Sequence, residues 1–186
     1  VSDLAYIGTN LPEKRDFFRK NVYPLADQWK LKIYGQDWTA GDYLLGWVQR
    51  AGQYFNVPGL RSLRKPKLAL TDEAKIYRSA KVSINVHEAY QREFGGDCNE
   101  RTFKIPFCGG FQVVDSVACI NKYFPGEGEL VMASNEREWV DLIHYYLENP
   151  EKRGDIIAAG QKRVLNEHTY HHRARQILGI MENRLH

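Results

Sequence analysis

The chain has 186 residues, 43% of them hydrophobic and 26% charged, with a formal net charge of +3. Its length suits a single domain with a substantial core, and its composition is ordinary for a folded globular protein. The charge is too small to indicate a nucleic-acid partner, and no apolar run approaches the roughly 20 residues of a membrane-spanning helix. The first residues, VSDLAYIGTN, lack an initiator methionine and a signal-peptide pattern, so we expect a fragment of a longer chain.

The three cysteines are Cys98, Cys108 and Cys119. An odd number of cysteines without a Cys-x-x-Cys pair argues against a disulfide framework and against a structural zinc site. We therefore expect a cytoplasmic location, where cysteines stay reduced. Cys108 and Cys119 are expected to be small buried hydrophobic residues.

Short apolar runs alternate with helical patterns along the chain. The first helical pattern opens at Pro12 and is interrupted at Pro24, and residues 36–67 are irregular apart from one helix. The polar stretch 87–99 is expected to be a loop with a Gly-Gly hinge. The strands expected in chain order are 4–8, 31–35, 81–86, 111–115 and 130–134. The helices expected are 12–29, 43–54, 71–80, one beginning near 99, 136–148, one beginning at 150, and a last one carrying Tyr170, Ala174, Ile177 and Met181.

Two of these helices begin at residues suited to capping. Thr71 is a natural N-cap, and Asp72 and Glu73 follow it in the first turn, where carboxylates favour the positive helix end. Asn135 can cap the helix expected over residues 136–148, and Glu138 is placed to complete a capping box with it. The apolar residues of that helix share one face: Trp139, Leu142, Ile143, Tyr146 and Leu147.

Strands that alternate with helices predict an α/β domain with a mostly parallel sheet. Ligands of such sheets bind beyond the carboxyl ends of the strands. The loops expected at that edge are 8–11, 35–38, 87–101 and 115–117.

Two short motifs near the start of the chain are open to more than one interpretation. GTNLPEKR follows the first strand but has neither Gly-x-Gly-x-x-Gly nor the Gly-Lys-Ser/Thr of a P-loop. It is a weak phosphate cradle or a capped helix start with Arg15 on the solvent face. RSLRKPK, residues 61–67, either meets an anionic ligand or is a solvated basic run.

A metal site is not expected. His168 and His172 have the i, i+4 spacing of helical metal ligands, but no Cys or acidic cluster nearby completes a site. Capping and packing at the start of the last helix by His168, Thr169 and Tyr170 is the favoured interpretation. The chain also contains no Asp-x-Asp, which favours cations and helix ends over a divalent ion as the partners of a nucleotide diphosphate.

The stretch NERTFKIPFCGG, residues 99–110, predicts a short helix with a polar start. Asn99 or Thr102 can cap it, and Arg101 projects from its first turn. A helix start carries unpaired N–H groups and a partial positive charge, so this one either holds an anion at the sheet edge or is an ordinary capped core helix. Gly109 and Gly110 are expected to end it with positive φ.

The ordered set of motifs resembles the C-terminal domain of GT-B glycosyltransferases, in particular the spore-maturation-type branch. The matching stretches are KVSINVH, NERTFKIPFCGGFQVVD, and YFPGEGELVMASNEREWVDLIHYYLENPEKRGDIIAAGQKRVLNEHTYHHRARQIL. The N-terminal stretches YIGT and IYGQDW, together with Arg15, are similar to the opening strands of that family. The likeness covers nearly the whole chain and is weakest from residue 41 to 67.

The resemblance implies a Rossmann-like parallel sheet flanked by helices, the C-terminal half of a GT-B fold, as a single nucleotide-sugar-binding domain over residues 1–186. It implies a hexosyltransferase-like enzyme that binds a nucleotide-diphosphate sugar without a metal or other cofactor. A preceding domain would bind the acceptor, which is an unknown glycan, lipid or protein. The expected catalytic residue is Arg101, at the diphosphate. The expected donor-binding residues are Gly8, Thr9, Arg15, His87, Asn99, Glu100, Arg101, Thr102 and Lys104.

The chain departs from the family pattern at Lys104. The family has a glutamate there that accepts hydrogen bonds from the donor ribose, and a lysine cannot accept them. Either another group such as Glu100 holds the ribose, or Lys104 reaches a phosphate, or the site is degenerate. His87 and Glu88 lie on the correct loop for a base, but the family takes its base from the other domain. A non-catalytic binding module with a degenerate glycosyltransferase fold is the alternative function.

Overall fold

The structure is a computed structural model that describes residues 1–61, 63 and 68–185. Its centre is a five-stranded sheet in the order β2-β1-β3-β4-β5, with every neighbouring pair parallel. The strands are β1 (Leu4–Ile7), β2 (Leu31–Tyr34), β3 (Val82–Asn85), β4 (Gln112–Asp115) and β5 (Val131–Ala133). The expected α/β class and all five expected strands are confirmed.

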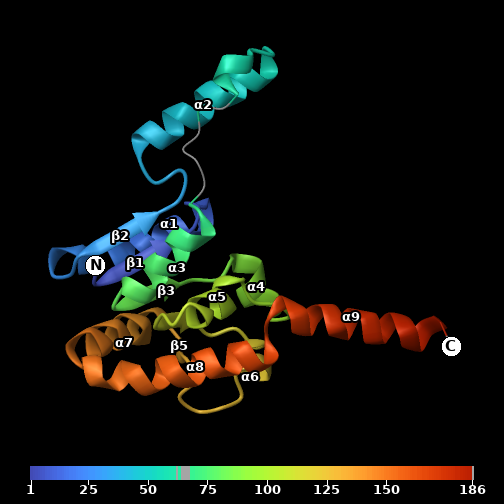
Figure 1. The fold of residues 1–186 in the computed structure, drawn as a ribbon. Helices are drawn as coiled ribbons and strands as arrows, with labels where there is room; N and C mark the ends of the chain where they lie inside the picture. Colours follow the sequence, from blue (N-terminus) through green and yellow to red (C-terminus); the bar gives the residue numbers. More distant parts are fainter. Residues whose placement is uncertain (62, 64–67, 186) are drawn as a thin grey trace.

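Helices connect the strands and cover both faces of the sheet (Figure 1). The α-helices are α1 (Pro12–Phe17), α2 (Ala40–Tyr54), α3 (Leu70–Ser79), α4 (Ala89–Phe94), α5 (Arg101–Phe107), α6 (Ile120–Tyr123), α7 (Glu136–Glu148), α8 (Arg153–Glu167) and α9 (Tyr170–Leu185). Shorter helical turns are η1 (Phe18–Val22), η2 (Tyr23–Asp27), η3 (Pro58–Leu60) and η4 (Pro150–Lys152).

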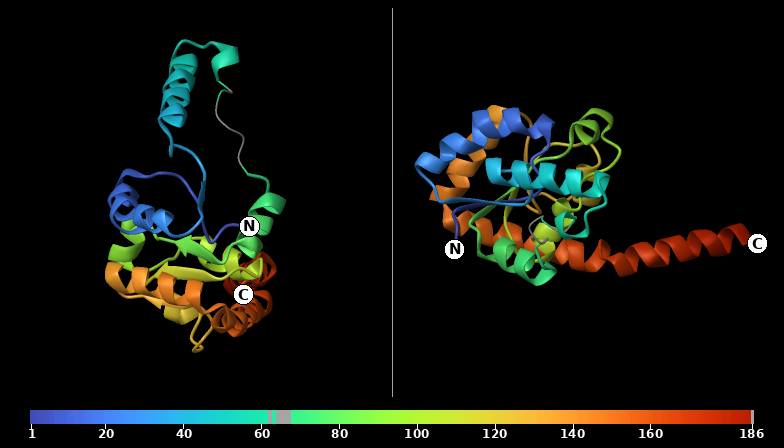
Figure 2. Two further views of the ribbon diagram at one scale, coloured as in Figure 1. Left: turned by 90° about the vertical axis from the view of Figure 1, so that its left-hand side faces the viewer. Right: turned by 90° about the horizontal axis from the view of Figure 1, so that it is seen from above.

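The sheet lies between two helical layers, which Figure 2 (left) shows edge-on. One layer holds α1, η1, η2 and α7, and the other holds α3, α5 and α8. Alternate strand residues face the two layers, because successive side chains of a strand point to opposite sides. Leu4 and Tyr6 of β1 join the first layer, whereas Ile7 packs with Tyr77 and Ile105 of the second.

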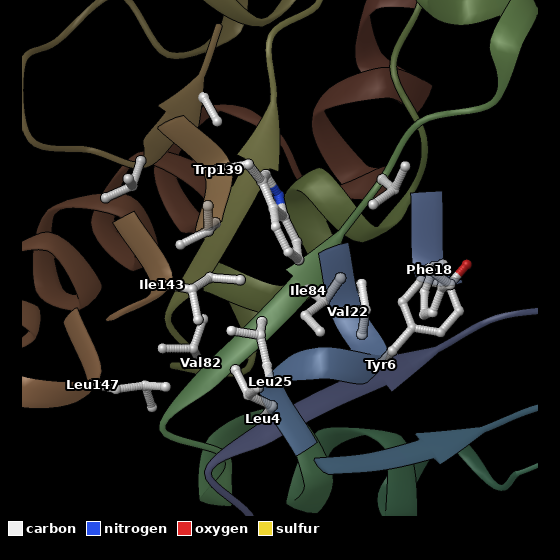
Figure 3. Packing of buried hydrophobic residues seen from close by; sticks show 14 of the residues in the cluster. Leu4, Tyr6, Phe18, Val22, Leu25, Val82, Ile84, Trp139, Ile143 and Leu147 are labelled. Carbon is white, nitrogen blue, oxygen red and sulfur yellow. The ribbon is translucent and has the colours of Figure 1, made fainter. Parts of the chain in front are cut away.

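The largest hydrophobic cluster is between the sheet and the first layer (Figure 3). The inward face expected for α7 is confirmed: Trp139, Ile143 and Leu147 are buried there, and Leu142 and Tyr146 pack against its edge. In Figure 3 the α7 side chains face Val82 and Ile84 of β3. The first helical pattern breaks into α1, η1 and η2, since Pro24 lies in the first turn of η2.

Two helices leave this body. α2 stands away from the sheet beyond β2, and α9 extends to the C-terminal end of the chain (Figures 1 and 2). The apolar residues of α9 that the sequence placed on one face are largely exposed, including Tyr170, Ile177 and Met181.

Three local expectations are wrong. The stretch 87–99, expected to be a loop because it is polar, contains the short helix α4 between Glu88 and Gly95. Thr71 is not an N-cap, because α3 begins one residue earlier, at Leu70. Cys108 is only partly buried, although Cys119 is buried as expected.

Two other expectations have a mixed outcome. Asn135 caps α7 as expected, accepting from the Glu138 N–H at 3.0 Å, but the Glu138 carboxylate accepts from Ser134 N instead of completing a capping box with Asn135. Most of the basic run 61–67 is outside the described residues, so its expected contact with an anion has no structural outcome.

Replacing Ile143 by Ala should lower the free energy of unfolding by about 2–5 kcal/mol, because Ile143 is 0% exposed and the truncation leaves a cavity in the main cluster. The matched control is Ile180→Ala, since Ile180 of α9 is 56% exposed. It should change the free energy by less than about 1 kcal/mol. Urea unfolding followed by circular dichroism measures both, and equal effects of the two substitutions would contradict the assigned core.

Candidate functional site

The strand order gives a topological switch point between the carboxyl ends of β1 and β3, and the region around it is called the crevice below. The chain leaves β1 toward β2 on one side and then returns to β3 on the other side of β1. Loops that follow β1 and β3 therefore diverge at this point, and in open parallel sheets this switch in direction is where ligands bind. The residues that follow the two strands, together with the start of α5, form the candidate site.

The loop after β1 is fastened to the loop after β2. The Trp38 indole N–H donates to the Gly8 carbonyl at 2.7 Å, and the Asn10 amide donates to the Asp37 carbonyl at 2.7 Å. Gly35 has a φ of +140°, and a Cβ there would lie 2.0 Å from the Gly8 oxygen, so only glycine allows this approach. Gly8 and Thr9 are thus held in one conformation beside the crevice.

Three charged side chains meet at this switch point: Lys14, Glu88 and Arg101. The Lys14 ammonium is 2.5 Å from Glu88 Oε1 and 3.4 Å from the Tyr6 hydroxyl, and its side chain is 1% exposed. Arg101 Nη2 lies 3.9 Å from the same Glu88 oxygen. Two cations from different helices therefore converge on one carboxylate oxygen.

Burial controls the electrostatics of this cluster. It lowers the pKa of Lys14, and the Glu88 carboxylate acts against that by favouring the charged ammonium. Burial also raises the pKa of Tyr6 to about 12, so its hydroxyl stays protonated. The second Glu88 oxygen, Oε2, is buried without a hydrogen-bond partner among the described residues. Lys14, Glu88 and Arg101 thus carry two positive charges and one negative charge, the Glu13 carboxylate interacts with Glu88 from the side, and one Glu88 oxygen is an unsatisfied acceptor.

Residues at the end of β3 fix the orientation of the Arg101 side chain. Its Nε donates to Asn85 Oδ1 at 3.2 Å and its Nη2 donates to the Val86 carbonyl at 2.9 Å. The guanidinium also lies over the Tyr6 ring, 5.7 Å from its centroid. These contacts hold Arg101 at the sheet edge, where the sequence placed it.

A buried polar network joins β3, β4 and α5 beneath the charged cluster. The Asn85 amide donates to Thr102 Oγ1 and to Gln112 Oε1, and the Gln112 amide donates to the Thr102 carbonyl. The His87 ring contacts Asp115 through Nδ1 at 2.7 Å and Thr102 through Nε2 at 3.3 Å. Satisfied buried polar groups favour one arrangement over others, so this network fixes where α5 begins.

Three N–H groups at the start of α5 are paired within the chain itself. Asn99 Oδ1 accepts from the Thr102 N–H at 3.2 Å, but the N-cap residue is Glu100, not Asn99 or Thr102 as expected. The next two N–H groups, those of Phe103 and Lys104, donate to the Glu100 carbonyl. Gly109 follows the helix with a φ of +73°, as expected, whereas Gly110 does not have the expected positive φ. The cations available to an anion here are therefore side chains, chiefly Lys14 and Arg101.

Lys104 lies in an acidic setting of its own. Its ammonium is 3.0 Å from Glu73 of α3 and 3.5 Å from Glu100. Glu100 also accepts a hydrogen bond from the Tyr170 hydroxyl at 3.0 Å. Lys104 thus bridges two carboxylates beside the crevice.

The structure separates Arg15 from the other expected donor-binding residues. Arg15 donates to the Tyr43 hydroxyl and lies over its ring, toward α2. Its neighbour Lys14 points into the crevice instead, and the sequence reasoning missed it. A signal was present: Lys14 precedes Phe17 and Phe18 by three and four residues, so it shares their inward helix face.

The histidines at the start of α9 pack and cap, as the sequence favoured. The His168 ring lies against Phe103, Tyr123 and Phe124, and His172 Nδ1 accepts from the Thr169 hydroxyl at 2.6 Å. Within residues 1–61, 63 and 68–185, no group of three or more His, Cys, Asp or Glu side chains is placed to hold a metal ion.

Comparison with known proteins gives a family and two similar folds. A model of the family described as Glycosyl transferase-like matches residues 15–179. The sucrose-phosphate synthase of Thermosynechococcus elongatus shares the fold with a TM-score of 0.65 and 15% identity, over 99% of this chain and 45% of that one. The C-terminal CMP-Kdo binding domain of WaaA from Acinetobacter baumannii has a TM-score of 0.50 and 17% identity, over 87% of this chain and 88% of that domain.

This chain therefore spans less than half of the sucrose-phosphate synthase chain that it resembles. No protein with a curated description matches its sequence.

Replacing Lys14 by Met should lower the free energy of unfolding by about 3 kcal/mol, because it leaves the Glu88 carboxylate without its partner. A double replacement, Lys14→Met with Glu88→Gln, should recover most of that loss. The control is Lys75→Met, since Lys75 pairs with Asp72 on the surface and is 78% exposed. It should cost less than about 1 kcal/mol. Urea unfolding tests the set, and a double variant as unstable as the single one would contradict a buried ion pair.

His168 should titrate below pH 6.5, because burial lowers its pKa. The Tyr123 carbonyl accepts from Nε2 and Arg173 donates to Nδ1, so the neutral ring carries its proton on Nε2. The stabilisation from the neutral ring is present above pH 6.5 and is lost as the pH falls through the lowered value. Long-range ¹H–¹⁵N NMR spectra of the histidines give both the pKa and the tautomer, and titration at or above 6.5 would contradict this packing.

Proposed function

Because the chain belongs to the glycosyl transferase-like family and has the fold of a GT-B C-terminal domain, we propose that it is the donor-binding half of a glycosyltransferase. The proposed substrate is a nucleotide-diphosphate sugar, with Lys14 and Arg101 facing the diphosphate. Glycosyl transfer is the activity class of the family. We propose three further details: the type of donor, the residues that contact its diphosphate, and transfer without a divalent cation.

The observation that carries this proposal is the meeting of Lys14 and Arg101 around one oxygen of Glu88. A carboxylate oxygen between two cations occupies the kind of environment that suits a phosphate oxygen. The two cations therefore already accommodate one negative oxygen between them. A diphosphate entering at the switch point would compete with Glu88 for the same two cations.

The chemistry of glycosyl transfer makes use of such a cluster. The sugar carbon becomes cation-like while negative charge gathers on the departing diphosphate. Fixed cations near that diphosphate stabilise the transition state more than the ground state. Arg101 is fixed in advance by Asn85 and Val86, and Lys14 by Glu88, so neither has to reorganise as charge develops.

The remaining expected residues take supporting parts in the proposal. Gly8 and Thr9 offer the backbone of a fastened loop. Asn99, Thr102 and His87 hold the start of α5 and so position Arg101. The two carboxylates beside Lys104, those of Glu73 and Glu100, would accept hydrogen bonds from the ribose hydroxyls. The part expected of Arg15 remains a prediction, with its side chain on Tyr43.

The whole enzyme is a further part of the proposal. An acceptor-binding domain would precede this chain, the transferred sugar would be a hexose, as the sequence resemblance implies, and the protein would act in the cytoplasm. The general base would come from the acceptor-binding domain. The acceptor is a glycan, lipid or protein that binds outside this chain.

A second function has one observation in its favour. Lys104 is engaged by both Glu73 and Glu100, so the acceptors proposed for the ribose are already paired with a cation. A module that keeps the fold but has lost nucleotide binding would show this arrangement. Calorimetric titration with UDP, GDP, ADP, dTDP and CMP separates the two functions, because the degenerate module binds none of them, even with the preceding domain attached.

Arg101→Ala should raise the Kd of the best-binding nucleotide about 10- to 150-fold, the loss of one charge-assisted donor. In the intact enzyme it should lower turnover about 100- to 1000-fold.

The matched control is Arg153→Ala. Arg153 also donates to a backbone carbonyl, that of Tyr146 at 2.6 Å, but it lies at the start of α8 beyond the end of α7. It should leave nucleotide affinity unchanged. Thermal melting checks that both variants are folded, and an Arg101→Ala variant that binds like the wild type would remove Arg101 from the proposed site.

A further inference from the structure

Helix α2, like α9, presents apolar side chains to solvent. Helix α2, the turn η3 and the residues joining them are called here the α2 arm, residues 39–61. Figure 1 and the left view of Figure 2 show α2 standing clear of the sheet and of both helical layers. The arm has no part in the crevice described above.

The exposed side of α2 is a continuous apolar face. Successive residues of a helix are about 100° apart, so Tyr43, Leu44, Trp47, Tyr54 and Phe55 fall within one third of its circumference. Trp47 is 69% exposed and Phe55 is 71% exposed, and Leu44 and Tyr54 are exposed to a similar degree. The opposite side carries the polar residues Asp42, Gln49 and Gln53.

The arm closes on itself through its other side. A Cβ on Gly52 would lie 2.4 Å from Leu60 Cβ, so helix and turn are in close contact there. The Gln49 amide donates to the Arg61 carbonyl at 2.8 Å. The internal contacts of the arm thus use the polar and glycine side of α2 and leave its aromatic face to the outside.

The positive charge of the chain is concentrated in the same region. Residues 39–69 contain five Lys or Arg and one Asp, a formal net charge of +4, whereas the whole chain carries +3. The other residues together therefore carry −1. The five basic residues are Arg50, Arg61, Arg64, Lys65 and Lys67, of which the structure describes Arg50 and Arg61, both exposed.

We propose that the α2 arm docks on an anionic membrane surface, with its aromatic face in the interface and Arg50 and Arg61 at the lipid headgroups. An amphipathic helix with Trp and Leu on one side and basic residues beside them has the composition of an interfacial helix. A single-stranded nucleic acid would stack on aromatic rings but would gain little from Leu44. A second copy of the chain would bring the same arginines, Arg50 and Arg61, toward this face instead of an opposite charge.

The arm would rest on the membrane without crossing it. Its 15-residue helix is about 22 Å long, less than the hydrocarbon thickness of about 30 Å. In the part of the chain that the structure describes, no helix has the length and apolar character needed to span a bilayer. Binding should therefore be reversible and sensitive to salt.

The experiment is co-sedimentation of the chain with vesicles of phosphatidylcholine alone and of phosphatidylcholine with phosphatidylglycerol, at low and high salt. We expect binding to the anionic vesicles at low salt and its loss at high salt. Trp47→Ala and Phe55→Ala should each weaken binding about tenfold or more, because each ring leaves water on docking. Arg50→Ser and Arg61→Ser should each weaken it about fivefold.

Matched controls exist outside the arm. Phe94→Ala removes a phenylalanine of α4 that is 76% exposed, and Arg137→Ser removes an exposed arginine of α7. Neither should change vesicle binding. Tryptophan emission should shift to shorter wavelength on binding in the wild type and lose much of that shift in Trp47→Phe, a variant that keeps an aromatic ring.

Several outcomes would overturn the proposal. These are absence of vesicle binding, equal binding to neutral and anionic vesicles, and arm variants that bind like the two controls. A monomer–dimer equilibrium in analytical ultracentrifugation that Phe55→Ala abolishes, without vesicle binding, would assign the face to a second copy. Oligonucleotide binding that the arm variants abolish, again without vesicle binding, would assign it to nucleic acid. The proposed donor site is untouched by any of these results.

Discussion

A buried ammonium group constrains the region where the strands end. The Lys14 side chain is almost entirely removed from water, which lowers its pKa, and the Glu88 carboxylate is the anion that compensates its charge. These two residues are far apart in the sequence and meet only because β3 lies directly beside β1. The strand order and the charge pair therefore depend on each other. A chain with β3 elsewhere in the sheet would leave a charge buried without a partner.

The polar network beneath this pair fixes the position of the motif residues at the start of α5. Asn85 at the end of β3 binds Thr102 and Arg101 together, and Gln112 on the next strand binds Thr102 again. The start of α5 is thereby fixed to two strands at once. Because Arg101 is the first residue of α5, its guanidinium is held near the Lys14–Glu88 pair. The preorganisation that the proposed chemistry requires comes from buried amides that never touch the substrate.

Regular periodicity made much of the fold predictable from sequence. The five apolar runs gave the strands, and the spacing from Trp139 to Leu147 gave the buried face of α7. Helix α4 was missed because six residues, five of them polar or aromatic, next to a Gly-Gly pair are too few to show a helical period. Thr71 was misassigned because a good capping residue does not by itself decide where a helix begins, and α3 starts one residue before it.

The candidate site was predictable only in part, for a different reason. A motif of contiguous residues placed Arg101 at the strand ends, and the loop rule placed His87 and Gly8 there. Lys14 and Glu88 were not predicted as a pair, because their meeting depends on the order of strands in the sheet. Sequence periodicity does not contain that order. The orientations of the Arg101 and Arg15 side chains likewise depend on neighbours from distant segments. Arg101 points toward Val86, and Arg15 points away from the crevice.

Adjacent residues of α1 connect the two surfaces for which a function is proposed. Lys14 points into the crevice, and Arg15 points out to Tyr43 at the start of the α2 arm. The loop leading to the arm is also tied to the loop after β1, through Trp38 to Gly8 and Asn10 to Asp37. The base of the arm is thus fixed to the same strand end that carries the proposed donor site. Docking of the arm on a membrane would set the orientation of that sheet edge relative to the bilayer, without any contact between the lipid and the donor site.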